Sequence, residues 1–356
     1  MKTVFCFVGT LVLIVLFQTP APAQLPDPSG EIAGQQSASQ LPNTPMHPRP
    51  TKWGEPTKVG AAIYVLDVDT VDSANQSFSA GIYYAATWRD PSLAHAGPGP
   101  KVVPTSAVWT PRLGIVNQQQ AWNALPSFVE VLPDGTVVLR QKTWGWFSQP
   151  FDLREFPLDR QKLTIHMVAA GLFESEVHMV PASGPHGRRS GIAETFSLPD
   201  FRVVDWMAEP RGYFPVKGEV GTAGFILELT VERIPNYYFW KLIVPLCLIV
   251  AMSWVPRWID SKEVGTSIGI AATGFLTLVA YLFATAVLLP KVPYFTRIDQ
   301  FILLSTLLVF FSLVQTVLHS YIAKHSTVAR VERINYWSRP LYPISLLIVL
   351  TVSFAL

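Results

Sequence analysis

Four long apolar segments dominate the last third of the chain. After Pro235 they cover about 237–258, 264–289, 297–322 and 338–356, and each is close to the roughly 20 residues that a helix needs to cross a bilayer. Charged residues fall mainly between them. The pattern predicts a membrane domain of four helices within 235–356, with Pro340 and Pro343 near the start of the last helix.

A different pattern covers residues 57–234. Short runs rich in β-branched and aromatic residues alternate there with turn residues, and no helix longer than a turn or two is indicated. The clearest predicted strands are AAIYVLDVDTV, SFSAGIYYAATW, SFVEVLP, TVVLRQKTW, KLTIHMV, FRVVDWM and FILELTVER. A segment of roughly 180 residues with this pattern is long enough for one two-sheet domain, so an all-β sandwich is predicted.

The first 56 residues are predicted to lie outside both domains. Lys2, the apolar run 4–17 and the small-residue site Ala21-Pro22-Ala23 are the three parts of a secretory signal peptide, predicted at 1–23. An uncut membrane anchor is the alternative. Residues 24–56 are rich in Pro, Gln, Ser and Gly and predict a flexible leader that builds no core.

Composition excludes several classes of function. Only 15% of the 356 residues are charged, and the net charge of +2 does not favour a nucleic-acid partner. The two cysteines lie in the signal peptide and in a membrane segment, so no intrachain disulfide is expected. The seven histidines show no metal-binding spacing, and no nucleophile, base and acid come together in the sequence. We therefore expect no metal, no cofactor and no enzymatic activity.

The second apolar segment has one distinctive face. At 100° per residue, its small, hydroxyl-bearing and bulky apolar positions fall in a stripe about 80° wide. This face is either the wall of a pore, narrowed by the bulkier side chains, or a helix-packing surface, since small residues also mark helix contacts in membranes. The residues of this stripe are Gly265, Gly269, Thr273, Leu276, Ala280, Phe283 and Val287.

Five short motifs follow one another in a fixed order. They are Trp88-Arg89-Asp90-Pro91, Trp109-Thr110-Pro111, Phe156-Pro157-Leu158-Asp159-Arg160-Gln161, Arg233-Ile234-Pro235-Asn236-Tyr237 and Leu289-Pro290-Lys291-Val292-Pro293-Tyr294. In register with four membrane segments, they resemble the pentameric ligand-gated ion channels, particularly the bacterial members, over residues from about 57 to 356. Gln149 and Leu163 stand where animal receptors carry the two loop cysteines. Without that disulfide, the loop must be held by packing of Phe151, Phe156 and Pro157.

The resemblance implies a homopentamer in the bacterial inner membrane, with the sandwich in the periplasm. The positive-inside tendency supports this orientation, because the cytoplasmic loops carry more basic residues than the external one. The cytoplasmic residues are Arg257, Lys262, Lys324, Arg330, Arg333 and Arg339, and the external ones are Lys291 and Arg297.

The resemblance also implies gated conduction through a path lined by the second helix. Monovalent cations are the expected permeant ions, selected by a ring of Glu263 carboxylates. Glu263 lies two residues beyond the usual position of the family's acid, where this chain has Gly265. Its alternative role is a solvated charge at a helix start. A membrane-anchored periplasmic sensor that does not conduct is the alternative function.

Two further groups of residues follow from the resemblance. Coupling between the sandwich and the membrane domain is expected from Asp72, Phe156, Pro157, Asp159, Arg233, Pro293 and Tyr294. An agonist site between neighbouring sandwiches would use Tyr83, Tyr213 and Phe214, whereas Val116 and Ala170 replace two further aromatics. The loss of these two rings argues against an aromatic cage for a quaternary ammonium ligand. The activating ligand can still be a small molecule, such as a primary amine or an acid, or it can be the proton.

Overall fold

The structure is a computed structural model that describes residues 47–52, 54–182, 189–216, 220–260, 263–325 and 328–354. The predicted signal peptide and most of the predicted leader lie outside the described residues. The strands run from Thr57 to Arg233, and the long helices follow from Asn236 to Phe354. The all-β sandwich followed by four apolar helices confirms the predicted fold class.

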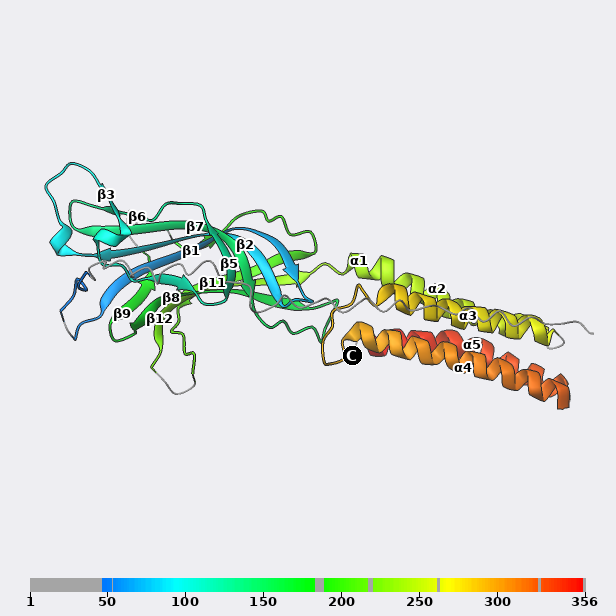
Figure 1. Ribbon diagram of the computed structural model, residues 1–356. Helices are drawn as coiled ribbons and strands as arrows, with labels where there is room; N and C mark the ends of the chain where they lie inside the picture. The colour runs from blue at the N-terminus through cyan, green and yellow to red at the C-terminus, as the bar shows by residue number, and fades with distance from the viewer. Residues whose placement is uncertain are drawn as a thin grey trace, which may run out of the picture. The chain divides into compact units, whose positions relative to one another are not determined.

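Two β-sheets form the sandwich (Figure 1). The larger sheet has the order β10-β1-β2-β7-β6-β3, with β5 paired to β7 and β9 paired to β1. Its strands are β1 (Thr57–Asp72), β2 (Ser77–Arg89), β3 (Lys101–Pro104), β5 (Gln118–Asn123), β6 (Phe128–Val131), β7 (Thr136–Ser148), β9 (Val177–Pro181) and β10 (Gly191–Ile192). The smaller sheet has the order β11-β12-β8-β4. Its strands are β4 (Leu113–Ile115), β8 (Arg160–Phe173), β11 (Phe201–Pro210) and β12 (Thr222–Arg233).

Alternation of apolar and polar residues produces the core of the sandwich. Successive side chains of a strand point to opposite faces, so every second residue can be buried between the sheets. In β12, Phe225, Leu227, Leu229 and Val231 follow this period, and all four are buried. The strand therefore covers the core with one face and presents polar residues such as Glu228 with the other.

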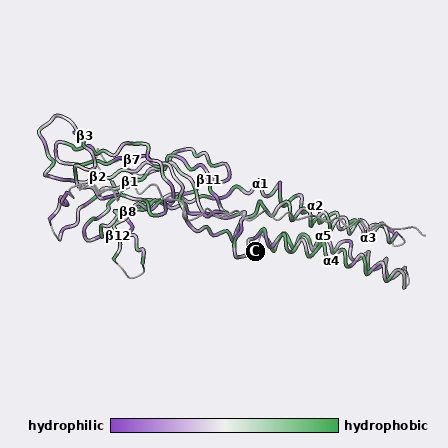
Figure 2. Tube along the Cα trace, viewed as in Figure 1, coloured by the Kyte–Doolittle hydropathy of each residue, from purple (hydrophilic) through white to green (hydrophobic). Residues whose placement is uncertain are grey.

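Among the described residues, four helical segments are long and apolar enough to cross a membrane: Asn236–Trp258, Val264–Thr285, Arg297–Ile322 and Tyr336–Phe354. The first combines α1 (Asn236–Tyr238), a π-helical turn η3 (Phe239–Ile243), α2 (Val244–Met252) and a 3-10 turn η4 (Val255–Trp258). The others are α3 (Val264–Thr285), α4 (Arg297–His325) and α5 (Val328–Phe354). Figure 2 shows hydrophobic stretches along these helices. The chain is therefore a multi-pass membrane protein.

Two helix boundaries differ from those read from hydropathy. Helix α3 ends at Thr285, and the predicted segment's last residues form a turn before Pro290, because proline disfavours a helical conformation in the residue before it. Helix α5 begins at Val328 and contains both Pro340 and Pro343. Membrane helices tolerate such prolines, since neighbouring groups can satisfy the freed backbone carbonyls.

Candidate functional site

An ion pair lies where the sandwich meets the membrane domain. Arg233, the last residue of β12, donates from Nε to Asp159 Oδ1 at 2.7 Å and from Nη2 to Asp159 Oδ2 at 3.2 Å. The side chains are only 3% and 1% exposed, respectively. The backbone N–H of Arg233 also donates to the carbonyl of Asp159 at 3.1 Å. The last residue of β12 is thus fixed to the loop that precedes β8.

Aromatic rings surround the guanidinium of Arg233. Its Cζ lies 4.3 Å from the ring centre of Phe201 and 4.9 Å from that of Phe156. The Phe156 ring meets Tyr238, in the first membrane-spanning segment, edge to face at 4.8 Å. Rings that face a cation stabilise it where water is excluded. Arg233 and Phe156 therefore connect the sandwich to the start of the membrane domain.

The loop before β8 also contacts the connection between α3 and α4. The hydroxyl of Tyr294 accepts from the backbone N–H of Leu153 at 3.0 Å and donates to the carbonyl of Phe151 at 3.2 Å. The N–H of Arg297 donates to the carbonyl of Arg154 at 3.0 Å. These bonds were not predicted from the sequence. Phe151, Phe156 and Pro157 are buried and Pro293 is exposed. The loop without a disulfide is therefore held by both packing and hydrogen bonds.

Asp72 lies at the same junction but contacts its own hairpin. Its carboxylate accepts from the N–H groups of Ala74 and Asn75, both at 3.0 Å, and from Asn75 Nδ2 at 2.7 Å. Burial raises the pKa of Asp72, but these hydrogen bonds outweigh it and hold the pKa below its usual value. Ser73 contacts Arg233 instead, since its Oγ accepts from Nη2 at 2.8 Å.

A cavity of about 400 Å³ separates this hairpin from the end of α3. Its lining includes Asp72, Arg233 and Val287. The hairpin and the end of α3 therefore both line this cavity.

The seven stripe residues of α3 and its C-terminal turn are all exposed in the single subunit. Leu276 is 68% exposed and Phe283 is 78% exposed, whereas Ala271, Gly274 and Leu278 on the opposite face are buried. Val287 lies in the turn beyond the end of the helix. The face predicted from periodicity is thus the face that α3 does not use against its own subunit.

The glycines of this face are not explained by packing within the subunit. A Cβ added to Gly265 or Gly269 would meet no atom of the described residues within 4 Å, whereas one added to Gly274 would contact Ser253. The hydroxyl of Thr273 donates to the carbonyl of Gly269 at 2.8 Å. The hydroxyl proton is used in this bond, and the hydroxyl oxygen at the exposed surface can still accept a hydrogen bond.

Glu263 lies at the N-terminal boundary of α3. Its backbone carbonyl accepts from the N–H of Ser267 at 3.1 Å, while its side chain is exposed and makes no capping hydrogen bond. Both roles suggested by the sequence, a ring of selecting carboxylates and a solvated charge at the helix start, fit an exposed side chain at this position.

The three predicted ligand residues belong to opposite sheets. Tyr83 lies in β2, paired with Tyr64 of β1 and Lys142 of β7. Tyr213 and Phe214 lie in the connection between β11 and β12, where Tyr213 pairs with Thr222 and Phe214 is exposed. The structure therefore places Tyr83 in the larger sheet and the other two beside the smaller sheet, and a ligand site shared by two neighbouring sandwiches stays a prediction.

His166 lies under this connection. Its ring meets Tyr213 edge to face at 5.4 Å, and its Nε2 donates to the carbonyl of Arg211 at 2.9 Å. Burial, assisted by the charge of Arg211, lowers the pKa of His166 despite that hydrogen bond. Arg211 is itself paired with Glu228 at 2.6 Å and with Glu209 at 2.5 Å. This charged cluster was missed from the sequence because only the pairing of β11, β12 and β8 assembles it.

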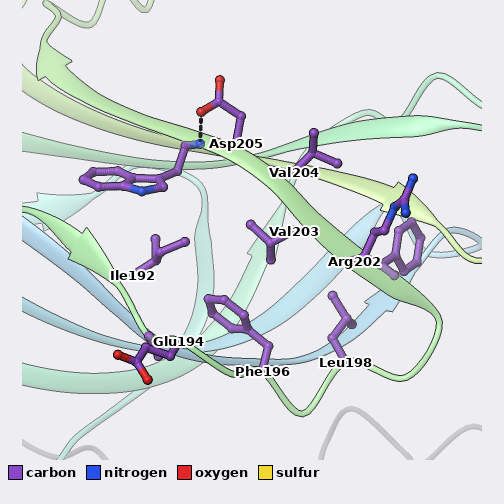
Figure 3. A pocket seen from close by; sticks show the side chains of 11 residues that line it. Ile192, Glu194, Phe196, Leu198, Arg202, Val203, Val204 and Asp205 are labelled. Atoms are coloured by element: carbon purple, nitrogen blue, oxygen red, sulfur yellow. Dashed lines mark hydrogen bonds between the residues drawn. The ribbon is translucent and has the colours of Figure 1, made fainter.

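A separate groove of about 680 Å³ opens beside β11. Figure 3 shows Ile192, Phe196 and Val203 turned toward one another in it, with Glu194 and Asp205 directed outward. None of Tyr83, Tyr213 and Phe214 lines this groove. Within the described residues, no cluster of three or more His, Cys, Asp or Glu side chains could hold a metal ion.

A β-sandwich of two sheets followed by four helices long and apolar enough to span a membrane defines a multi-pass membrane protein with a large β-domain. Residues 43–211 match the model of the neurotransmitter-gated ion-channel ligand binding domain, and residues 242–341 match that of the neurotransmitter-gated ion-channel transmembrane region. A proton-gated ion channel of Gloeobacter violaceus is 24% identical over 316 residues, which span 85% of this chain and 83% of the relative. The chain belongs to the bacterial pentameric ligand-gated ion channels, a family of ion channels and not of enzymes.

Proposed function

We propose that the chain forms a homopentamer in the bacterial inner membrane and conducts monovalent cations when a ligand or protons bind. A subunit of four helices has no channel of its own, so an ion path must lie on a rotation axis between copies. The observation that carries the proposal is the exposed face of α3, where Gly265 and Gly269 have open space beside them. Five such faces around an axis form a path with room for water and ions.

Rings of apolar side chains close this path. Leu276 and Phe283 are the bulkiest side chains of the stripe, and both project from the exposed face. A narrow apolar ring excludes water and stops ions, and a small tilt or rotation of the helices opens it. A ring of Leu276 side chains can therefore close the ion path without charged side chains.

Opening requires that the sandwich move the end of α3. The buried pair Arg233–Asp159 holds the end of β12, which leads into the first membrane-spanning segment, to the loop before β8. The hydroxyl of Tyr294 binds the same loop to the connection between α3 and α4. A change in the arrangement of neighbouring sandwiches can therefore reach the connection after α3 through these direct contacts.

The activating ligand is proposed to act at the sandwich. The relative from Gloeobacter violaceus is gated by protons, and the titratable His166 packs against Tyr213 beside the predicted agonist site. Protons and small molecules that contact Tyr83 on one subunit and Tyr213 or Phe214 on the next are the candidates.

The test is a measurement of current through the purified protein in planar lipid bilayers. Discrete single-channel steps that appear on acidification or on addition of small amines or acids are expected. A non-conducting sensor would bind a ligand and remain silent, and saturable flux without single-channel steps would indicate a transporter.

The pore face has its own test. After Cys247→Ala removes the half-buried native thiol, cysteines at Gly269 and Thr273 should react with a charged thiol reagent in open channels. A cysteine at Leu248, an exposed residue of α2, serves as the control outside the predicted pore face. Reaction at Leu248 alone would contradict a pore lined by α3.

A further inference from the structure

The groove beside β11 lies at the open edge of the sandwich. β10 is at one end of the larger sheet and β11 is at one end of the smaller sheet. Residues of both strands, and of the segment that joins them, line the groove. Its volume of about 680 Å³ is in the range of pockets that hold small molecules. The groove is therefore a candidate binding site within a single subunit.

Hydrogen bonds hold the walls of this groove in place. The N–H of Ala193 donates to the carbonyl of Val65 in β1 at 2.9 Å, and the N–H of Ser197 donates to Asp67 Oδ1 at 2.7 Å. On the other wall, β11 is paired with β12 along its length. Because both walls are bonded to a sheet, the groove is formed before a ligand arrives, and binding costs little ordering entropy.

The interior of the groove is apolar. Ile192, Phe196 and Val203 point toward one another across it (Figure 3). Trp206 also lines the groove and is 37% exposed. An indole ring offers a flat apolar surface to a chain or a ring, and its face attracts a cation. The walls therefore fit a ligand with an apolar body, and Trp206 adds a preference for positive charge.

The charged groups of the groove favour the same sign of ligand. Glu194 and Asp205 line it, and neither forms an ion pair within the part of the chain that the structure describes. Asp205 Oδ1 accepts from the N–H of Trp206 at 2.8 Å. Arg202 also lines the groove, but its Nε and Nη2 donate to Glu232 Oε2 at 3.1 Å and 2.8 Å. The groove therefore has an excess of negative charge.

We propose that this groove binds an amphiphilic organic cation, which is an amine that carries an apolar chain or ring. The apolar part lies between Ile192 and Phe196 on one wall and Val203 on the other, and the ammonium group faces Trp206 and Asp205. A neutral ligand would leave the carboxylates unpaired, and an anion would be repelled by them. The site differs from the predicted agonist site, because none of the residues predicted for that site lines the groove.

Phe201 connects the groove to the junction with the membrane domain. It lines the groove, and its ring centre lies 4.3 Å from Cζ of Arg233. Phe201 and Arg233 are also paired residues of β11 and β12. A molecule in the groove therefore lies against the strand whose first side chain covers the pair of Arg233 with Asp159. The proposal does not depend on ion conduction, since binding can be measured without current.

The test compares three ligands with one carbon skeleton and different charge. Phenylbutylamine is a cation at neutral pH, phenylbutanol is neutral and phenylbutyrate is an anion. Their binding to the purified full-length protein in detergent is titrated by the rise in thermal unfolding temperature. We expect the amine to bind at least about tenfold more tightly than the alcohol, since cation–π contacts and charge-assisted hydrogen bonds contribute at this level. Equal affinities of the amine and the alcohol would overturn the proposal.

Hydrogen exchange locates the bound amine. Amides of residues 192–206 should exchange more slowly when phenylbutylamine is bound. Amides of residues 209–216, beside the predicted agonist site, should keep their exchange rates. Protection of residues 209–216 without protection of residues 192–206 would assign the amine to the agonist site, and the groove would then not be its binding site.

Variants separate the role of charge from the role of shape. Asp205→Asn keeps an oxygen for the N–H of Trp206 but removes the charge, and in combination with Glu194→Gln it should abolish the preference for the amine. Val203→Trp fills the groove without changing its charge and should weaken the binding of all three ligands. Glu174→Gln neutralises an exposed acid between β8 and β9 and should keep the preference. A preference for the amine that survives in the double variant would exclude the two carboxylates as its partners and so overturn the proposal.

Discussion

The carboxylate of Asp159 and the guanidinium of Arg233 form a pair at 2.7 Å that is almost fully excluded from solvent. The pair lies between the last strand of the sandwich and the loop that contacts the connection between α3 and α4. Its burial distinguishes it from the other ion pairs of the sandwich, such as that of Arg202 with Glu232, where the arginine is 68% exposed. The difference in burial has a measurable consequence.

Removing Arg233 should destabilise the protein strongly. Arg233→Ala leaves the carboxylate of Asp159 buried without its partner, which costs about 3–5 kcal/mol. We expect a lower unfolding temperature, measured by thermal unfolding in detergent, together with impaired assembly or opening. Arg202→Ala is the matched control, since an exposed pair contributes under about 1 kcal/mol. Equal effects of the two substitutions would contradict the role assigned to burial.

Leu276→Thr should make the closed channel easier to open. In the proposed pentamer, a hydroxyl in each of the five side chains would lower the free-energy cost of wetting the narrow ring, so the open state gains stability relative to the closed state. Single-channel recording should show a higher open probability at the same stimulus. Leu248→Thr changes an exposed leucine of α2 and should leave the open probability unchanged. If only Leu248→Thr increases opening, Leu276 is not the gate.

Glu263→Gln should reduce the preference for cations. In the proposed pentamer, five carboxylates at one mouth of the path would raise the local concentration of cations and repel anions, and the amide removes this charge. The reversal potential under a salt gradient should move toward zero. Glu55→Gln, which neutralises an exposed acid before β1, is the control. A reversal potential that is the same for wild type and Glu263→Gln would exclude this residue from selection.

Acidification should loosen the connection between β11 and β12. Burial lowers the pKa of His166 from its ordinary value of 6.5, so the unfolded or opened chain binds the proton more readily than the packed one. The stability that depends on neutral His166 is present above 6.5 and is lost as the pH falls through the lowered pKa.

Hydrogen exchange between about pH 5 and pH 8 can measure this loss. Amides of residues 209–216 should exchange faster at low pH after correction for the intrinsic rate, and His166→Gln should remove the extra acceleration. His178→Gln, at an exposed position of β9, should retain it. Acceleration that persists in His166→Gln would assign the effect to another group.

The sequence alone was sufficient for the elements whose pattern is local. Each of the seven clearest predicted runs lies largely within a strand, because the alternation of apolar and polar residues shows which face of a strand is buried. The stripe of α3 could be predicted because the helical period shows which residues share one face of a helix. Short strands such as β4, β9 and β10 were not predicted, since two to five residues carry too little pattern. The structure ends α3 at Thr285, before its apolar run ends, and begins α5 at Val328, before its apolar run starts, because hydropathy marks the apolar run and not the helix.

Only the tertiary structure decided which groups meet. The motif that contains Asp159 and the segment that begins with Arg233 are visible in the sequence, but their bidentate contact, and the contact of Ser73 rather than Asp72 with Arg233, depend on how the hairpin packs. The same holds for Arg257, which the sequence suggested as a cytoplasmic loop charge and which the structure buries. Hydropathy reports the tendency of a segment to leave water. Which residue pairs with a charged side chain depends instead on how segments far apart in the sequence pack together.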